Sequence, residues 1–286
     1  MRRLALLSVF CVFFSTESQA ELVADGEWQF DLPAVAGLCP LSRTVQHDQL
    51  YLAQQERLQA GNNRLLAAAV LCDELEAWRR RQVPASSWAL WLLAARDGVP
   101  VQMPTGLERA KVLDELARAM PKLDLSRVAA EMRQRTAKEG VSLSPQSFGV
   151  IDRDRNGLYM AMVGDFTVGD RTTQTYGVVG MTLIGTRIVS LNLYRANPDA
   201  NSIEDMLPIV QRTLAQAVSL DEERARSVAG SSPSSPPAPA RPSVDNERWG
   251  TVAMNGLGAL LVVGLIVAVG LGWRAWARRQ RFTWRR

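Results

Sequence analysis

The longest apolar segment of this 286-residue chain restricts what the whole chain can form: residues 249–273 contain no charged side chain. A helix of about 20 apolar residues spans the hydrocarbon core of a bilayer, and a helix satisfies all its backbone polar groups internally. The sequence therefore predicts one C-terminal transmembrane helix at residues 249–273, with the lipid bilayer as its partner. Six arginines and no acidic residue follow in residues 274–286, which predicts a cytoplasmic basic tail.

The start of the chain predicts the same topology. Two arginines precede an apolar core at residues 4–14, and Ser18-Gln19-Ala20 has the small residues of a cleavage site. This order is typical of a secretory signal peptide at residues 1–20. An uncleaved anchor helix is the alternative, although this apolar core is short for a membrane span. We therefore expect residues 21–227 to be the exported domain of a single-pass inner-membrane protein, periplasmic if the cell is Gram-negative.

The net charge of +4 comes from the two ends of the chain. Without the two leader arginines, the six tail arginines and Glu17, 25 basic residues (33 − 8) stand against 28 acidic ones (29 − 1). Nucleic-acid binding needs clustered Lys and Arg, and the exported part contains no such block. The composition therefore excludes nucleic acid as a partner.

Residues 228–248 predict a Pro/Ser-rich stalk between the exported domain and the membrane. The stretch from Gly230 to Pro242 contains five prolines and no large apolar residue. Such a chain is extended and semi-rigid, at about 3.1 Å per residue. We therefore expect the stalk to hold the domain away from the bilayer.

Cys39 and Cys72 are the cysteines of the exported domain. In an oxidising compartment two cysteines favour one disulfide. Two buried thiols that act as small apolar side chains are the alternative. The sequence does not give the Cα separation that a disulfide requires, so both interpretations stay open.

Residues 21–140 mix strand and helix patterns. Thr105 and Glu108 form a capping box, which predicts a helix from about residue 104 to Met120. The other elements predicted in this half are strands at 27–32, 65–71 and 87–95 and helices at 48–60, 73–81 and 126–138.

From residue 147 the apolar period changes to two, which predicts consecutive strands joined by hairpin turns. Ser202 then caps an amphipathic helix that reaches about residue 220. The predicted fold class is α+β: an antiparallel β-meander packed on helices, plus one C-terminal transmembrane helix. The predicted strands are 148–152, 158–167, 173–184 and 187–194, with turns at Asn156-Gly157 (type I′), Gly169-Asp170 and Gly185-Thr186. The predicted buried face of the helix contains Ile203, Met206, Leu207, Val210, Leu214 and Val218.

The segment from Val179 to Tyr194, followed by a turn and an amphipathic helix, resembles the C-terminal part of exported α+β domains related to the PsbP and DcrB proteins. The resemblance covers residues 147–220 and consists of a topology and a strand–turn–strand pattern. It implies a sheet packed on helices and a role in binding or assembly. It supplies no catalytic residues, and the C-terminal anchor departs from the lipid-anchored or soluble forms of that group.

Asp152, Asp154 and Asn156, with Gly157, have the spacing of calcium ligands in a loop that glycine turns sharply. The twelfth position should be Glu and is Val163. A polar hairpin is therefore the alternative interpretation. Calcium binding would need a further acid, such as Asp165 or Asp170, to fold over the loop.

His47 is the single histidine, so a hydrolase of the usual kind would have to use it. Cys39 and Asp48 are near in sequence, which does not imply that their side chains face His47. A solvated or capping imidazole is the alternative. Four tryptophans of this half could line an apolar groove or fill the core: Trp28, Trp78, Trp88 and Trp91.

Gly264, Ala268 and Gly272 recur every four residues in the apolar segment. Such a stripe of small residues lets two membrane helices pair, which predicts self-association, although Gly and Ala are common in any spanning helix. Together, these features predict a non-catalytic binding or scaffolding role toward an envelope protein, without a cofactor. The alternative is an envelope enzyme, or a calcium or small-ligand sensor, that uses acids near Asp152 and Asp154.

Overall fold

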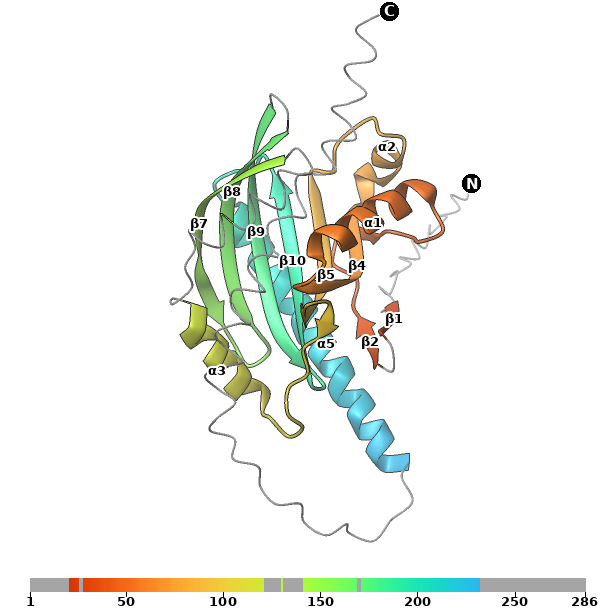
Figure 1. Cartoon of the computed structure of the whole chain (residues 1–286), viewed down its shortest axis with the longest axis vertical. Helices are drawn as coiled ribbons and strands as arrows, with labels where there is room; N and C mark the ends of the chain where they lie inside the picture. The colour runs from red at the N-terminus through yellow and green to blue at the C-terminus, as the bar shows by residue number, and fades with distance from the viewer. Residues whose placement is uncertain (1–20, 26–27, 121–129, 131–140, 169–170, 232–286) are drawn as a thin grey trace, which may run out of the picture.

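Figure 1 shows a computed structural model of the chain, which describes residues 21–25, 28–120, 130, 141–168 and 171–231. The described strands are β1 (Glu21–Asp25), β2 (Trp28–Leu32), β3 (Leu38–Pro40), β4 (Asn63–Leu71), β5 (Ser87–Arg96), β6 (Val99–Pro100), β7 (Val141–Arg153), β8 (Leu158–Val168), β9 (Arg171–Ile184) and β10 (Arg187–Ala196). The described helices are α1 (Gln46–Gln59), the 3-10 helix η1 (Cys72–Glu74), α2 (Leu75–Arg79), α3 (Arg109–Ala119) and α5 (Ser202–Ser231).

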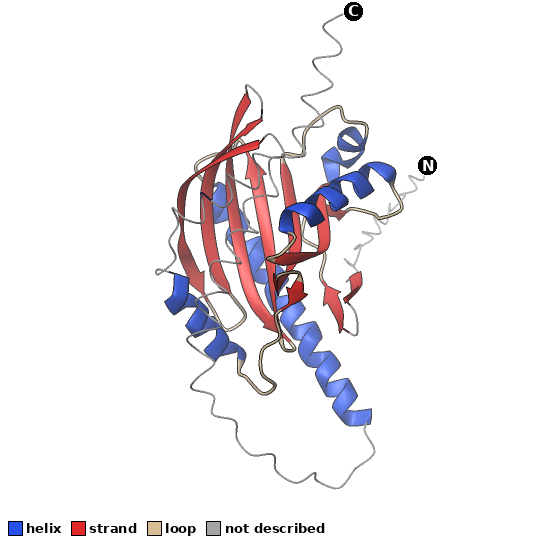
Figure 2. Cartoon of the chain, viewed as in Figure 1, coloured by secondary structure: helices blue, strands red, loops and turns tan. Residues whose placement is uncertain are grey.

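An antiparallel sheet forms the centre of the described domain, with helices on both of its faces (Figure 2). Its strand order is β3-β4-β5-β10-β9-β8-β7, with β6 paired to β5 and the β1–β2 hairpin separate. The consecutive strands β7 to β10 are the predicted meander, and β5 from the first half of the chain joins β10. The α+β prediction and the antiparallel meander are therefore confirmed.

The sheet separates two apolar cores. On one face α1, α2 and α3 cover a core that contains Leu90, Met160 and Val179. On the other face α5 packs on a core that contains Leu191 and Val178. Strands β5 and β10 are both buried on two faces. The middle of β5 is accordingly an uninterrupted apolar run, the pattern expected of a fully covered strand, whereas β10 also buries Ser190 and Asn192.

Helix α5 approaches β9 closely because Gly180 has no side chain. A Cβ there would lie 2.6 Å from Val210 Cγ1 and would also meet Leu214. The six residues predicted for the inner face of this helix are all buried or partly buried against the core. The helix therefore packs directly on the middle of the sheet.

Two predicted helix starts are wrong. Helix α3 begins at Arg109, because Gly106 has a φ of +83° and Leu107 N donates to Pro104 O, so a turn occupies the expected first residues. Thr105 is therefore no N-cap. Ser202 is the first residue of α5, and its hydroxyl donates to Asp199 Oδ1. The helix also continues to Ser231, into the segment predicted as stalk.

Several predictions fall outside the described residues. These are the signal peptide, the helix at 126–138 apart from residue 130, the turn at Gly169-Asp170, the transmembrane helix with its stripe Gly264, Ala268 and Gly272, and the basic tail. Within the described ranges, no helix is both long enough and apolar enough to cross a membrane.

We expect the domain to lose stability steeply above pH 10, because three of its tyrosines are buried. Burial raises the pKa of Tyr51, Tyr159 and Tyr194 above the ordinary value of 10. Above pH 10 the unfolded chain releases these protons while the folded chain retains them, so each tyrosine lowers the free energy of unfolding by about 1.4 kcal/mol per pH unit. Urea unfolding between pH 8 and 11 measures this slope. Tyrosine absorbance that titrates smoothly near pH 10 in a protein with native circular dichroism would contradict it.

Candidate functional site

Cys39 and Cys72 form a disulfide, so the disulfide prediction is confirmed. It joins β3 to η1, and the two Cα atoms are 4.8 Å apart. Cys39 is half-buried and Cys72 is exposed. The disulfide therefore fixes a short edge strand to the end of β4.

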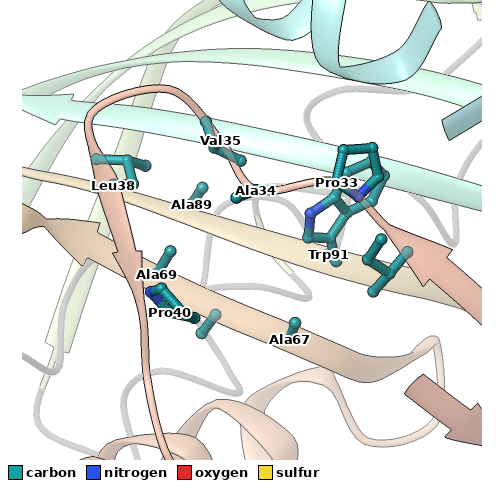
Figure 3. Close-up of a pocket in the computed structure, with 11 residues that line it drawn as sticks. Pro33, Ala34, Val35, Leu38, Pro40, Ala67, Ala69, Ala89 and Trp91 are labelled. Carbon is teal, nitrogen blue, oxygen red and sulfur yellow. The ribbon is translucent and has the colours of Figure 1, made fainter. Parts of the chain in front are cut away.

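An apolar hollow lies beside this disulfide, where the segment between β2 and β3 passes over β4 and β5 (Figure 3). Its volume is about 50 Å³, and every residue that lines it is apolar. The lining residues are Leu32, Pro33, Ala34, Val35, Leu38, Pro40, Ala67, Ala68, Ala69, Ala89 and Trp91.

Backbone hydrogen bonds fix the wall of the hollow. Leu38 N donates to Val35 O at 3.0 Å, closing a turn in which Gly37 has a φ of +76°. Cys72 N donates to Gly37 O at 3.1 Å, and Leu41 N donates to Ala68 O at 2.8 Å. The segment is thus held against β4 on both sides of the disulfide, and the hollow is formed before any ligand binds.

Small side chains make the floor of the hollow. Ala67 and Ala69 of β4 and Ala89 of β5 face it, and Trp91 closes one end (Figure 3). Metabolite pockets are typically about 300–1,000 Å³, and a cavity of about 150 Å³ holds benzene. A space of about 50 Å³ therefore suits part of one aliphatic side chain.

The outer edge of β3 offers no backbone donor to an added strand. Gly37 O accepts from Cys72 N, and Leu41 N donates to Ala68 O of β4. By strand alternation the backbone N and O of Leu38 and Pro40 therefore point away from β4. Leu38 N already donates to Val35 O, and proline has no N–H. Because strand addition uses free backbone donors as well as acceptors, this edge is poorly suited to it.

Two of the three predicted calcium ligands have hydrogen-bond partners within the protein. Asp152 Oδ2 accepts from Gln211 Nε2 at 2.7 Å. Asp154 accepts from Asn156 N, Gly157 N and the Tyr159 hydroxyl at 2.7–3.0 Å. Within the described ranges, no group of three or more His, Cys, Asp and Glu side chains is placed to hold a metal ion. Calcium binding by Asp152, Asp154 and Asn156 stays a prediction.

The loop at Asp154 also differs from the predicted type I′ turn. Neither Asn156 nor Gly157 has a positive φ. The Asp154 carboxylate holds the turn instead, and glycine avoids crowding, because a Cβ at residue 157 would lie 3.1 Å from Met181 O. Asp165 bonds to Gln146, and it lies seven residues beyond Leu158 in β8, about 23 Å along the strand. Asp165 is therefore not the further acid that calcium binding at this loop would need, and Asp170 lies outside the described residues.

His47 is not placed for nucleophilic catalysis with its neighbours in sequence. The sulfur of Cys39 is bonded to Cys72, and Asp48 is bonded to Arg79 at 2.7 Å. The His47 ring packs edge-on against the Trp78 ring, with 4.4 Å between the two ring centroids. His47 Nδ1 accepts a hydrogen bond from Arg81 Nε at 3.3 Å. The imidazole therefore has a packing role at the junction of α1 and α2.

Three of the four tryptophans belong to the core. Trp78, Trp88 and Trp91 are each at most 4% exposed. Trp28 is half-buried and receives the Arg187 guanidinium over its ring at 4.8 Å. The groove interpretation applies only to Trp91, which lines the hollow.

Sequence reasoning missed the hollow. The sequence features that form it are an apolar stretch at residues 32–36 and an alanine run at 67–69. Neither indicates a site alone, because they meet only in the folded sheet. The structure also pairs Asp48 with Arg79, 31 residues apart.

No protein-family model matches this chain, and no curated protein matches it either.

Proposed function

We propose that this protein is a single-pass inner-membrane protein whose exported domain binds an envelope protein without catalysing a reaction. The observation that carries the proposal is the preformed apolar hollow beside the disulfide. A short apolar pocket with a fixed wall is the kind of site that receives an anchoring side chain at a protein interface.

The chemistry of the lining favours a protein side chain as the occupant. Small-molecule sites combine apolar walls with a few polar groups that orient the ligand. Here all the lining residues are apolar, and the space suits part of an aliphatic side chain. A leucine, isoleucine or valine on a partner surface fits these requirements.

The sequence features outside the described domain support the location. A leader, a Pro/Ser-rich segment and a long apolar run with arginines after it predict an exported domain tethered to the inner membrane. A disulfide is typical of an oxidising compartment. The resemblance of residues 147–220 to exported PsbP- and DcrB-related domains implies a binding or assembly role as well.

Site-specific photo-crosslinking of the full-length protein in its own membrane tests the proposal. Ala36 is exposed between two lining residues, and Arg155 is exposed in the β7–β8 loop. We expect a photoreactive residue at position 36 to give one discrete protein adduct, and the same residue at position 155 to give no such adduct.

A variant whose hollow is filled by a larger side chain is the matched control for the crosslinking experiment. Ala67→Leu adds three carbons at the half-buried floor of the hollow, and we expect it to weaken binding by about tenfold or more and so remove most of the adduct. Equal adducts at positions 36 and 155, or an adduct at position 36 that Ala67→Leu leaves unchanged, would contradict the proposal.

A further inference from the structure

We propose that the Cys39–Cys72 disulfide gates the hollow, so that a dithiol reductant abolishes binding by releasing β3. The inference rests on the proposed function, because it concerns the same hollow. The gate would restrict binding to the oxidised protein.

The segment attached through the disulfide supplies most of the wall. Residues 32–35 together with Leu38 and Pro40 make up six of the eleven lining residues, and Cys39 lies between the last two. The sheet contributes mainly alanines, which by themselves form a shallow floor (Figure 3). The depth of the hollow therefore depends on the position of β3.

Few non-covalent bonds hold β3 in place. It is three residues long and pairs with β4 alone, at the edge of the sheet. Pro40 donates no backbone hydrogen bond. The side chains of Leu38 and Leu41 enter the two cores on opposite faces of the sheet. A three-residue edge strand that is paired on one side only belongs to the low-stability end of a fold, and the disulfide ties it covalently to the start of η1.

The disulfide is open to attack at Cys72, which is exposed, whereas Cys39 is half-buried. A thiolate of the reductant attacks Cys72 Sγ, the S–S bond breaks, and Cys39 leaves as a thiolate that takes up a proton. The second thiolate of the reductant then displaces Cys72. The protein gains two electrons and two protons as free thiols, and the reductant becomes a disulfide.

Hydrogen exchange tests the gate without a partner. The amides of Leu41 and Cys72 donate to Ala68 O and Gly37 O, the bonds that flank β3, and Val179 and Leu191 lie in the buried middle of the sheet. The comparison uses the full-length protein in detergent, oxidised and reduced with a dithiol, over low urea concentrations. Exchange through local opening does not respond to urea, whereas exchange through global unfolding accelerates with it.

After reduction we expect the Leu41 and residue-72 amides to exchange at least about tenfold faster than the central amides and to become insensitive to urea. The variant Cys39→Ser/Cys72→Ser should reproduce this without reductant. If the edge and central amides keep the same urea dependence after reduction, or if the sheet unfolds, β3 does not open by itself and the gate is overturned. Because no partner is used, failure here is distinguishable from failure of the proposed function.

Discussion

Replacing both cysteines, as Cys39→Ser/Cys72→Ser, is expected to lower the free energy of unfolding of the exported domain by about 3–4 kcal/mol. The disulfide connects residues 33 positions apart, and a loop of that length restricts the unfolded chain. Removing it returns conformational entropy to the unfolded state. A domain of this size has about 5–15 kcal/mol of stability, so the variant should still fold.

Urea unfolding at 25 °C, followed by circular dichroism, measures the loss. The midpoint should fall while the denaturant slope changes little, because nearly the same surface becomes exposed. Wild-type protein reduced with a dithiol is the matched control and should show the same midpoint as the double-serine variant. If neither treatment moved the midpoint, the loop would be constrained by other contacts in the unfolded state, and the chain-entropy argument would not apply.

The sheet was predictable because its signals are local. Alternation marks β8 and β9, and the apolar run at residues 65–71 forms β4. The turn at Gly185 has the predicted positive φ of +56°. The sequence does not reveal which strands far apart in the chain are neighbours, so the pairing of β5 with β10 was not predicted.

Predictions of turns and helix starts failed where a side chain or a backbone group made a hydrogen bond that the local sequence pattern does not indicate. The Asp154 carboxylate satisfies the amides of its own loop, so the loop needs no type I′ turn. Before α3, the hydrogen bond from Leu107 N to Pro104 O closes a turn at the residues that were expected to begin the helix. Such competing hydrogen bonds are visible only once the chain is folded.

The hollow could not be predicted because it exists where small alanine side chains leave a space that larger side chains would fill. Ala67, Ala69 and Ala89 come from two strands, and the sequence pattern of alanines gives no hint that the segment between β2 and β3 crosses them. By contrast, the disulfide that fixes its rim was one of two interpretations that the cysteine count allowed. The cysteine content of a sequence therefore indicates a disulfide more readily than it indicates the hollow beside that disulfide.

The second large effect concerns Asp48 and Arg79, which join α1 to α2. Arg79 Nε and Nη2 donate to the two Asp48 oxygens at 3.1 and 2.7 Å, and Ser42 N donates to Asp48 Oδ2 at 2.9 Å. The hydrogen bond to Asp48 raises the pKa of Arg79. The Asp48 side chain is 0% exposed and that of Arg79 is 22% exposed. The sequence hid this pair because adjacent helix positions point about 100° apart, so Asp48 turns away from His47.

Arg79→Met should lower the free energy of unfolding by about 3–5 kcal/mol, since it leaves a fully buried carboxylate without its cation. Asp48→Asn should cost less, because the partly exposed guanidinium can turn toward water. Urea unfolding of both variants and of the double variant gives the coupling energy. We expect Asp48→Asn/Arg79→Met to be more stable than Arg79→Met alone, because the double variant buries no unpaired charge. If the two single losses simply added, the carboxylate would find another partner, and α1 and α2 would be held together by the contacts of Trp78 instead.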